Sequence, residues 1–322
     1  MKKNKFLAVI LCISLSVIFM PSCSSKTTEQ KKIAVIVKAL DSDFWHSVKN
    51  GVDAASTEYN VAVTFEGPEN EEDYVTQNKL IENAVKNKVD AIVLSAIDYE
   101  KSAETVNNAV RSGVKVLTVD SSVNSDRVSM FIGTDNFDAG KKAAEAAVKC
   151  FSGDEDINIG LINYYKSTEN GMQREDGFRQ YLKDIKNAKI VSAVNVNSNT
   201  QSVVSAVNSL IAQHPEINVL VGFNEWMTLG IGNSVKQLNL GEKVHAIGFD
   251  TNSVSVGMLE TGEIDTLIVQ NPFAIGYLGI KNAADLISGE MPQKKEIYTD
   301  AIAVNKNNLF DKDIQKLVFR FK

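Results

Sequence analysis

The chain has 322 residues, of which 44% are hydrophobic and 23% are charged, and its formal net charge is −6 at pH 7. This composition is typical of a globular protein, and the length is sufficient for a large core or for two cores. Because an acidic surface repels phosphate backbones, we expect no nucleic acid partner.

The N-terminal residues have the pattern of a secretory signal peptide. Lys2, Lys3 and Lys5 carry positive charge, and an uncharged apolar stretch follows at residues 6–20. This stretch is shorter than the ~20 residues that a membrane-spanning helix needs. We therefore predict a signal peptide at residues 1–22, which places the bulk of the chain outside the cytoplasmic membrane.

The end of this segment resembles the lipobox of bacterial lipoproteins, because the small residue Ser22 directly precedes Cys23. The resemblance implies that Cys23 is acylated through its sulfur and becomes the new N-terminus. Met20 departs from the leucine that is usual three places upstream of such a cysteine. An uncleaved N-terminal anchor and simple secretion are the two alternatives. Residues 23–32 are polar after the cysteine and predict a flexible, lipidated tether.

Cysteine usage limits what covalent or metal chemistry the mature chain can contain. Cys12 leaves with the signal peptide and Cys23 is blocked by lipid, so Cys150 remains as a single thiol. An intrachain disulfide and a metal cluster built on cysteines are then excluded. We predict that Cys150 is a core residue on the apolar side of a helix. We expect no metal and no cofactor.

After the tether, short runs rich in β-branched residues alternate with segments of helical periodicity. Several runs are apolar without alternation, as expected for parallel strands that are covered on both faces. The order predicts an α/β fold with doubly wound parallel sheets. The predicted strands are Ile33–Val37, Val61–Phe65, Ala91–Leu94, Val116–Val119, Ile157–Ile162, Val219–Phe223, Val244–Phe249 and Ile264–Val269.

Helices are predicted between these strands; in one of them Val203, Val207 and Leu210 recur at helical spacing, with Thr200 as the expected N-cap. Eight or more strands are too many for one ordinary doubly wound sheet, so we predict two lobes. The expected N-terminal lobe comprises residues 33–134 plus 271–299, and the C-terminal lobe comprises residues 135–270 plus 300–322.

The residues that follow the predicted strands form a distinctive set, and in open α/β sheets ligands bind at these strand ends. Asp, Asn, Arg and Gln recur there, and their planar termini can hydrogen-bond two neighbouring hydroxyl groups at once. Phe44 and Trp45 offer flat apolar faces for the C–H side of a ring. The polar positions are Lys38, Asp41, Ser42, Ser95, Asp120, Ser121, Asp135, Asn136, Arg174, Asn224, Asp250 and Gln270. The combination favours a small neutral polyol in a cleft.

In order and spacing, these motifs resemble the periplasmic ribose/galactose-type sugar-binding proteins, which are type I solute-binding proteins of ABC importers. The resemblance runs from about Ile33 to about Val304. It rests on Leu40 with Phe44-Trp45, Val119-Asp120, Asp135-Asn136, Arg174 with Gly177-Phe178, His214-Pro215, Asn224 with Met227 and Leu229-Gly230, Gly248-Phe249-Asp250, and Gln270 with Ile275-Gly276. It implies two Rossmann-like lobes and a three-segment hinge, near Asp120–Asn124, Asp250–Asn252 and Gln270–Pro272.

The resemblance also implies a set of ligand-binding residues, because the matching positions of ribose binders contact the sugar. These are Phe44, Trp45, Asp120, Arg174, Asn224, Phe249, Asp250 and Gln270, and Ser42 and Ser95 are candidates where ribose binders use asparagine. Ser121 replaces an arginine, and Ser198 stands where a ring-stacking phenylalanine is expected. A buried polar group without its partner costs ~1–3 kcal/mol, so such departures reset specificity. We therefore predict a pentose or hexose rather than ribose itself, with another small polyol left open.

The predicted function is an extracytoplasmic, monomeric lipoprotein that binds a small sugar and delivers it to the permease of an ABC importer. The alternative is a receptor component that senses a sugar or signal and feeds a sensor kinase or chemoreceptor. A repressor with the same core is disfavoured, because the signal peptide occupies the place of its DNA-binding helices.

Catalysis is not expected. No Ser-His-Asp order, HExxH, GxSxG or P-loop pattern occurs, and His245 lies in a predicted strand beside no obvious partner. The strand-end set is rich in Arg, Asn and Gln, which favours holding a sugar over cleaving it with a carboxylate pair.

Overall fold

The computed structural model describes residues 30–319. The predicted signal peptide, the lipidation site Cys23 and most of the predicted tether lie outside this range. Lys32, which we expected in the tether, is instead the first residue of strand β1 (Lys32–Ile36), because it pairs with Ala62 of the neighbouring parallel strand. Among the described residues, no helix is both long enough and apolar enough to cross a membrane.

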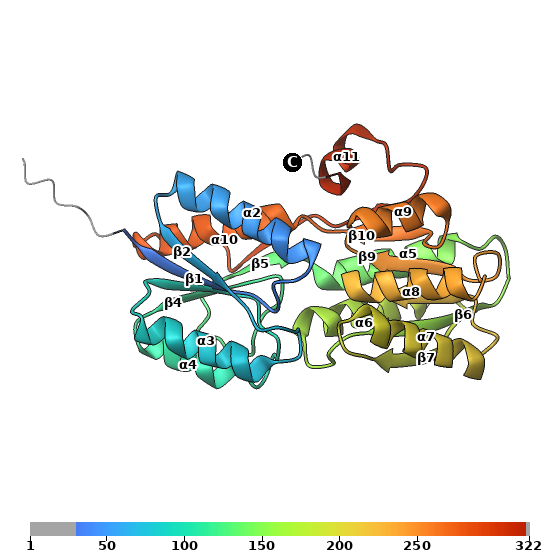
Figure 1. The fold of residues 1–322 in the computed structure, drawn as a ribbon, viewed down its shortest axis with the longest axis horizontal. Helices are drawn as coiled ribbons and strands as arrows, with labels where there is room; N and C mark the ends of the chain where they lie inside the picture. Colours follow the sequence, from blue (N-terminus) through green and yellow to red (C-terminus); the bar gives the residue numbers. More distant parts are fainter. Residues whose placement is uncertain (1–29, 320–322) are drawn as a thin grey trace, which may run out of the picture. The chain divides into compact units, whose positions relative to one another are not determined.

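Two six-stranded sheets form the centres of two α/β lobes (Figure 1), which confirms the predicted fold class. The N-terminal lobe has the strand order β11-β5-β4-β3-β1-β2, and the C-terminal lobe has the order β12-β10-β9-β8-β6-β7. All neighbouring strands are parallel except β10 and β12. The strands after β1 are β2 (Ala62–Glu66), β3 (Ala91–Leu94), β4 (Lys115–Val119), β5 (Phe131–Thr134), β6 (Ile157–Asn163), β7 (Ala188–Asn195), β8 (Val219–Gly222), β9 (His245–Phe249), β10 (Thr266–Val269), β11 (Glu296–Thr299) and β12 (Ile302–Val304).

The N-terminal lobe buries both faces of its sheet under helices. Alternate residues of β1 point to opposite faces, so Ile33 and Val35 join one core cluster and Ala34 and Ile36 join the other. The first face packs against α2 (Asp43–Glu58) and α10 (Pro272–Ile287), and the second packs against α3 (Tyr74–Lys86) and α4 (Ala103–Arg111). This two-sided burial explains why β1 is a continuous apolar run in the sequence.

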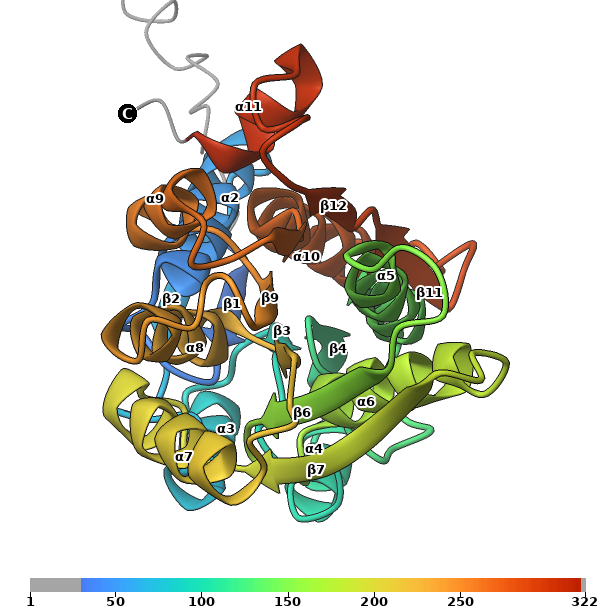
Figure 2. The ribbon, with the colours of Figure 1, turned by 90° about the vertical axis from the view of Figure 1, so that its right-hand side faces the viewer.

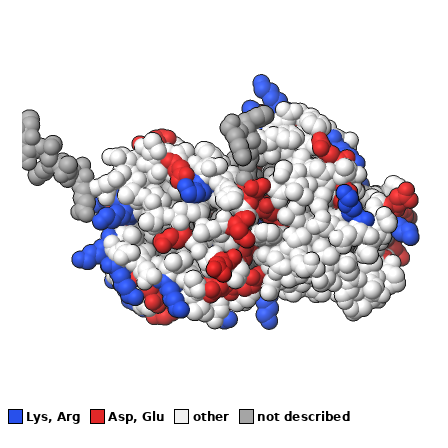
Figure 3. All heavy atoms as spheres, viewed as in Figure 1, with Lys and Arg blue, Asp and Glu red and all other residues white. Residues whose placement is uncertain are grey.

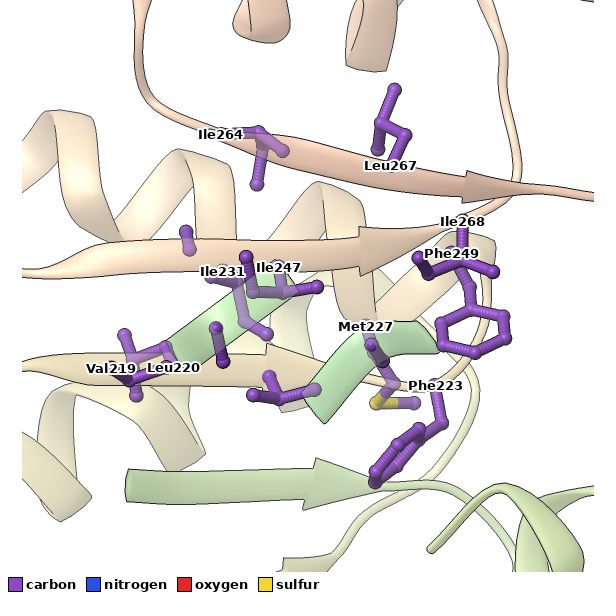
Figure 4. Close-up of a cluster of buried hydrophobic side chains, with 14 of the residues drawn as sticks. Val219, Leu220, Phe223, Met227, Ile231, Ile247, Phe249, Ile264, Leu267 and Ile268 are labelled. Atoms are coloured by element: carbon purple, nitrogen blue, oxygen red, sulfur yellow. The ribbon is translucent and has the colours of Figure 1, made fainter. Parts of the chain in front are cut away.

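The C-terminal lobe repeats the arrangement, and Figure 2 shows α5 and α6 on one side of its sheet and α7 and α8 on the other. Its helices are α5 (Asn136–Lys149), α6 (Glu169–Leu182), α7 (Thr200–Gln213), α8 (Glu225–Gln237), α9 (Ser253–Thr261) and α11 (Lys312–Val318). Figure 4 shows part of its core, in which Phe223, Met227 and Phe249 lie near one another. The Phe223 and Phe249 centroids are 5.9 Å apart in an edge-to-face contact.

The predicted N-cap of α7 is wrong by one residue. Asn199 is the cap, and its Oδ1 accepts the N–H of Ser202 at 2.9 Å. Thr200, the expected cap, is the first helical residue. Asn199 has an extended backbone and a short acceptor side chain, which are the two properties that an N-cap needs.

The chain passes from one sheet to the other three times, between β5 and α5, between β10 and α10, and between β11 and β12. Gln270–Pro272 lies in the second passage, as expected for a hinge segment. Asp120–Asn124 and Asp250–Asn252 do not cross, which corrects the other two expected hinge segments. The reason is that β4 and β5 are neighbours in one sheet and β9 and β10 are neighbours in the other, so each of these loops stays within its lobe.

Candidate functional site

The carboxyl ends of the central strands of both lobes surround a narrow cavity of about 20 Å³, roughly the space of one water molecule. Eight of the ten predicted ligand-binding residues line it: Ser42, Phe44, Trp45, Asp120, Arg174, Asn224, Asp250 and Gln270. Six further residues complete the lining: Lys38, Glu71, Tyr164, Asn170, Glu225 and Trp226. The sequence had indicated only Lys38 among these six, as a residue that flanks the cleft.

The other two predicted residues lie directly behind the lining. Ser95 Oγ donates to Asp120 Oδ2 at 2.9 Å, and the ring of Phe249 lies 4.7 Å from the Arg174 guanidinium carbon. Both side chains therefore hold a lining residue in position. Ser121 and Ser198, which mark departures from ribose binders, are likewise absent from the lining.

Asp120 and Asp250 occupy equivalent places in the two lobes. Each directly follows a central strand, and each has a left-handed backbone, with φ of 59° and 65° respectively. The N–H of Asp120 still donates to Ile132 O at 3.0 Å, and that of Asp250 donates to Ile268 O at 3.0 Å. Such backbone strain costs of order 1–3 kcal/mol and occurs preferentially at functional sites. Here it turns both carboxylates out of the sheets and into the cavity.

Lys38 provides a buried positive charge beside Asp120. Its Nζ lies 3.0 Å from Asp120 Oδ2, and the side chain is only 5% exposed. The ammonium also lies 5.7 Å from the Trp45 ring centroid and 5.6 Å from that of Tyr164. Burial lowers the pKa of Lys38, but the interactions with Asp120, Glu71 and Tyr164 together outweigh this effect and raise the pKa above its usual value. Lys38 therefore stays charged beside Asp120.

Arg174 brings a fork of donors to the same cavity, although it is 1% exposed. Its Nε donates to Asn136 Oδ1 at 2.9 Å, and its Nη1 donates to Phe223 O at 2.6 Å. Its Nη2 is buried without a hydrogen-bond partner among the described residues. Because buried donors are nearly always paired in native proteins, a ligand acceptor is the natural partner of this atom.

Two glycines set the position of α6 and therefore of Arg174. A Cβ atom on Gly140 would lie 2.0 Å from Arg174 O, and one on Gly177 would lie 1.9 Å from Phe137 O. Helices α5 and α6 therefore approach each other more closely than any side chain would allow. This explains why the sequence places glycine three residues after Arg174.

We expect Gly140→Ala to weaken sugar binding and to lower stability by about 1–3 kcal/mol, because the new methyl group would push α6 and Arg174 away. Gly257→Ala is the matched control, since Gly257 lies in helix α9 and a Cβ there would meet nothing within 4 Å. Calorimetric titration and thermal unfolding would measure both effects. Equal behaviour of the two variants would show that the α5–α6 contact does not position Arg174.

Carboxylates of the two lobes also bond across the boundary, where acidic side chains gather on the face seen in Figure 3. Glu71 Oε2 accepts from Asn224 Nδ2 of the other lobe at 3.4 Å, while its Oε1 accepts from Trp45 Nε1 of its own lobe at 3.0 Å. Glu225 Oε2 of the opposite lobe accepts the Phe44 N–H at 3.3 Å. These bonds join the cavity walls on which a ligand would lie.

Gln270 connects a chain crossing to the cavity. Its Oε1 accepts from Thr134 Oγ1 at 2.8 Å, and its Nε2 donates to Asp250 Oδ1 at 2.7 Å. Thr134 and Gln270 each lie at a point where the chain leaves one sheet for the other. Burial raises the pKa of Asp250, and the Arg174 charge opposes that rise. A change in the angle between the lobes would thus alter the hydrogen bond that Gln270 donates to Asp250.

We expect sugar affinity to increase as the pH falls from about 7 toward 4.5, by roughly tenfold. Glu169 of α6 accepts the Ser122 N–H of the other lobe at 3.3 Å, and burial raises the pKa of Glu169 to about 7. In separated lobes the carboxylate would be hydrated, with an ordinary, lower pKa. The closed form therefore binds the proton more tightly, is favoured below pH 7, and loses this advantage as the pH rises through 7.

Titration calorimetry across this pH range would measure the effect. Burial also raises the pKa of Glu225, so its contribution has the same sign. Glu169→Gln should flatten most of the pH dependence, whereas Glu175→Gln, on the same helix, should not. A wild-type affinity that rises with pH would contradict the expectation.

The fold and this cavity define a two-lobed α/β binding protein, and comparison with known proteins gives its family. Residues 33–291 match the periplasmic binding protein domain, so the chain belongs to that family, in its type I sugar-binding branch. The D-ribose/D-allose-binding protein of Pseudomonas aeruginosa is 24% identical over 298 residues, which are 90% of this chain and 92% of that protein.

Solved structures of sugar-transport binding proteins are also similar to this chain. A carbohydrate transporter solute-binding protein from Agrobacterium radiobacter, in complex with D-arabinose, has a TM-score of 0.87 and 29% identity, covering 91% of this chain and 100% of that one. A chain in the XylFII–LytSN complex has a TM-score of 0.78 and 27% identity, covering 86% of this chain and 98% of that one. Membership of this family implies a location outside the cytoplasm and a role as a binding protein of a transporter.

Proposed function

We propose that this protein binds a pentose or hexose between its two lobes and delivers it to the permease of an ABC importer. The observation that carries the proposal is the unpaired Nη2 of Arg174, which faces a cavity that Asp120 and Asp250 also line. A donor fork and two carboxylates suit the adjacent hydroxyl groups of a sugar ring. Binding of D-arabinose by one relative, and the ribose and allose named for another, support the same ligand class.

The lobes would open to admit the sugar, since the closed cavity of about 20 Å³ is far smaller than a sugar ring. We propose lobe boundaries near residues 134/135, 270/271 and 299/300, at the three chain crossings. Across these boundaries Asn170 Nδ2 donates to Asp120 Oδ1 at 3.0 Å, and Thr168 Oγ1 donates to Ile97 O at 2.9 Å. A ligand that contacts both lobes adds to these bonds only in the closed form, and therefore favours closure.

The ten predicted side chains act in two ways in this proposal. Ser42, Phe44, Trp45, Asp120, Arg174, Asn224, Asp250 and Gln270 contact the sugar, and Ser95 and Phe249 position Asp120 and Arg174. Both lobes belong to the same chain, so a monomer contains all the residues that the proposed sugar site needs. In the proposed role the sugar is held and not cleaved, and Lys38, Ser95 and Gln270 fix the Asp120 and Asp250 carboxylates that accept from it.

The direct test is thermal unfolding of the purified protein against a panel of aldopentoses and aldohexoses that includes D-ribose, D-allose and D-arabinose. At a concentration of about 100 Kd a ligand should stabilise the native state by ~2.7 kcal/mol, a rise in Tm of about 5 °C or more. Amino acids and dipeptides serve as the comparison panel. A rise with these ligands and with none of the sugars would refute the proposal.

We also propose that Cys23 carries the lipid that anchors the protein to the outer side of the membrane. Cys23→Ser should therefore move the protein from the membrane fraction to the soluble fraction, or block removal of the signal peptide. Fractionation with radiolabelled fatty acid would measure both outcomes, with Cys150→Ser as the matched control. Membrane attachment that is unchanged in Cys23→Ser would contradict lipidation.

A sensing role is the second candidate, because one relative forms the XylFII–LytSN complex. In that role the closed, sugar-bound form would be recognised by a receptor component in place of a permease. Sugar uptake by cells that lack the protein separates the two: loss of uptake supports delivery, and normal uptake with a lost transcriptional response supports sensing.

A further inference from the structure

A second group of potential ligands lies at the opposite end of the C-terminal lobe's sheet. Cys150 caps α5, His245 is the first residue of β9, and Asp265 immediately precedes β10. One ligand atom from each lies within 4.8 Å of the other two. His245 therefore has a partner, which corrects the sequence interpretation: its Nδ1 lies 3.0 Å from Asp265 Oδ1.

The fold itself brings these residues together. Strands β9 and β10 are parallel neighbours, with Thr266 paired to Ile247. His245 at the start of β9 and Asp265 directly before β10 therefore lie at the same edge of the sheet. The N–H of Ala246 donates to Asp265 Oδ2 at 2.8 Å, which fixes the carboxylate and directs Oδ1 toward His245. On the other side, the Phe151 ring packs edge-on against His245 with centroids 5.2 Å apart.

We propose that Cys150, His245 and Asp265 bind a zinc ion, with water in the fourth position. Zinc prefers thiolate, imidazole and carboxylate ligands at about 2.0–2.3 Å, so tetrahedral coordination places ligand atoms roughly 3.3–3.7 Å apart. The separations here, from 3.0 Å to at most 4.8 Å, bracket that range. Small side-chain rotations would therefore complete the site on three elements that are already held in place.

The surroundings leave access for the ion and its water. Cys150 and Asp265 line an open cavity of about 590 Å³. The two lysines that line it, Lys142 and Lys149, are each paired with an acid of their own helix at 2.7 Å, Asp138 and Glu145 respectively. Their charges are thus compensated close by, which lessens their repulsion of a cation.

This site is separate from the sugar site, because β9 runs from His245 at one end to Phe249, directly before Asp250, at the other. A strand of this length spans roughly 15 Å. The ion would join the end of α5 to the starts of β9 and β10, and would therefore stabilise the C-terminal lobe without contacting the sugar. The inference does not depend on the identity of the sugar.

The test is titration of the full chain with zinc in the presence of a thiol-free reductant and a competing chromophoric chelator. Cys150→Ser and His245→Gln should each weaken zinc binding on the order of tenfold or more. His214→Gln is the matched control, because His214 lies beside Glu216, outside the group of Cys150, His245 and Asp265, and its replacement should have no effect. Cys12 and Cys23 are present in the wild type and in every variant, so a loss of zinc binding in Cys150→Ser is due to Cys150.

Cobalt provides a second readout, because a thiolate-to-cobalt charge-transfer band should appear in the wild type and be absent in Cys150→Ser. Zinc should also raise the Tm of the wild type and not that of Cys150→Ser, while sugar affinity stays unchanged in both. Zinc binding that is equal in the wild type, Cys150→Ser and His245→Gln would overturn the proposal. Absence of the cobalt charge-transfer band in the wild type would also overturn the proposal.

Discussion

Replacing Arg174 with methionine is expected to weaken sugar binding severely. The side chain is 1% exposed, and it presents the unpaired Nη2 while Nε and Nη1 are bonded to Asn136 and Phe223. Methionine keeps the length and apolar stem of the side chain but removes every donor. Loss of one partner from a buried, charged hydrogen-bond network costs ~2–5 kcal/mol, so affinity should fall by about a hundredfold or more.

Arg179→Met on the same helix provides the control, because Arg179 is exposed and pairs with Glu175 of its own helix at 2.6 Å. Calorimetric titration with the sugar identified in the panel would compare both variants with the wild type. Circular dichroism would establish that Arg174→Met remains folded. Retention of wild-type affinity in a folded Arg174→Met variant would show that Nη2 does not face the sugar.

The second large effect concerns the buried pair of Lys38 and Asp120, whose side chains are 5% and 3% exposed. Asp120→Asn should lower the free energy of unfolding by about 3–5 kcal/mol, because it removes the carboxylate that is paired with the buried Lys38 ammonium at 3.0 Å. It should also remove sugar binding, because the amide cannot accept at both of its ends.

A double variant separates these two consequences. Lys38→Met together with Asp120→Asn removes the uncompensated charge, so we expect much of the stability to return while sugar binding remains lost. Urea unfolding and calorimetric titration on the same samples would measure the two properties. A double variant less stable than Asp120→Asn would mean that Lys38 contributes through packing against Trp45 and Tyr164 and not through its charge.

The sequence was sufficient to predict the central strands of both lobes, because these are apolar on both faces. It was insufficient for the edge strands β7, β11 and β12, since β7 and β11 alternate between partly buried and exposed residues and β12 has three residues. Strand β5 is missing from the predicted strands, because Gly133 and Thr134 at its end are typical of turns. Pairing with β4 and β11 makes this segment a strand, and such pairing is not visible in local sequence.

The rule that ligands bind at strand ends found most of the cavity lining, and it failed for residues that reach the cavity from elsewhere. Glu71 comes from the turn before α3, and Asn170 comes from the first turn of α6. Neither follows a strand directly. Packing within the N-terminal lobe brings Glu71 to Trp45, and packing between the lobes brings Asn170 to Asp120. The left-handed backbone of Asp120 and Asp250 was equally hidden, since aspartate in a strand-end turn is ordinary.

The central claim is that a sugar is held between the lobes by Arg174, Asp120 and Asp250. A crystal structure of the protein with its strongest ligand from the panel tests this claim most directly. We predict a single ring between the lobes, with a hydroxyl oxygen within hydrogen-bond distance of Arg174 Nη2 and with both aspartates accepting from ring hydroxyls. A sugar bound anywhere else on the chain, with Arg174 Nη2 still unpaired, would contradict the account.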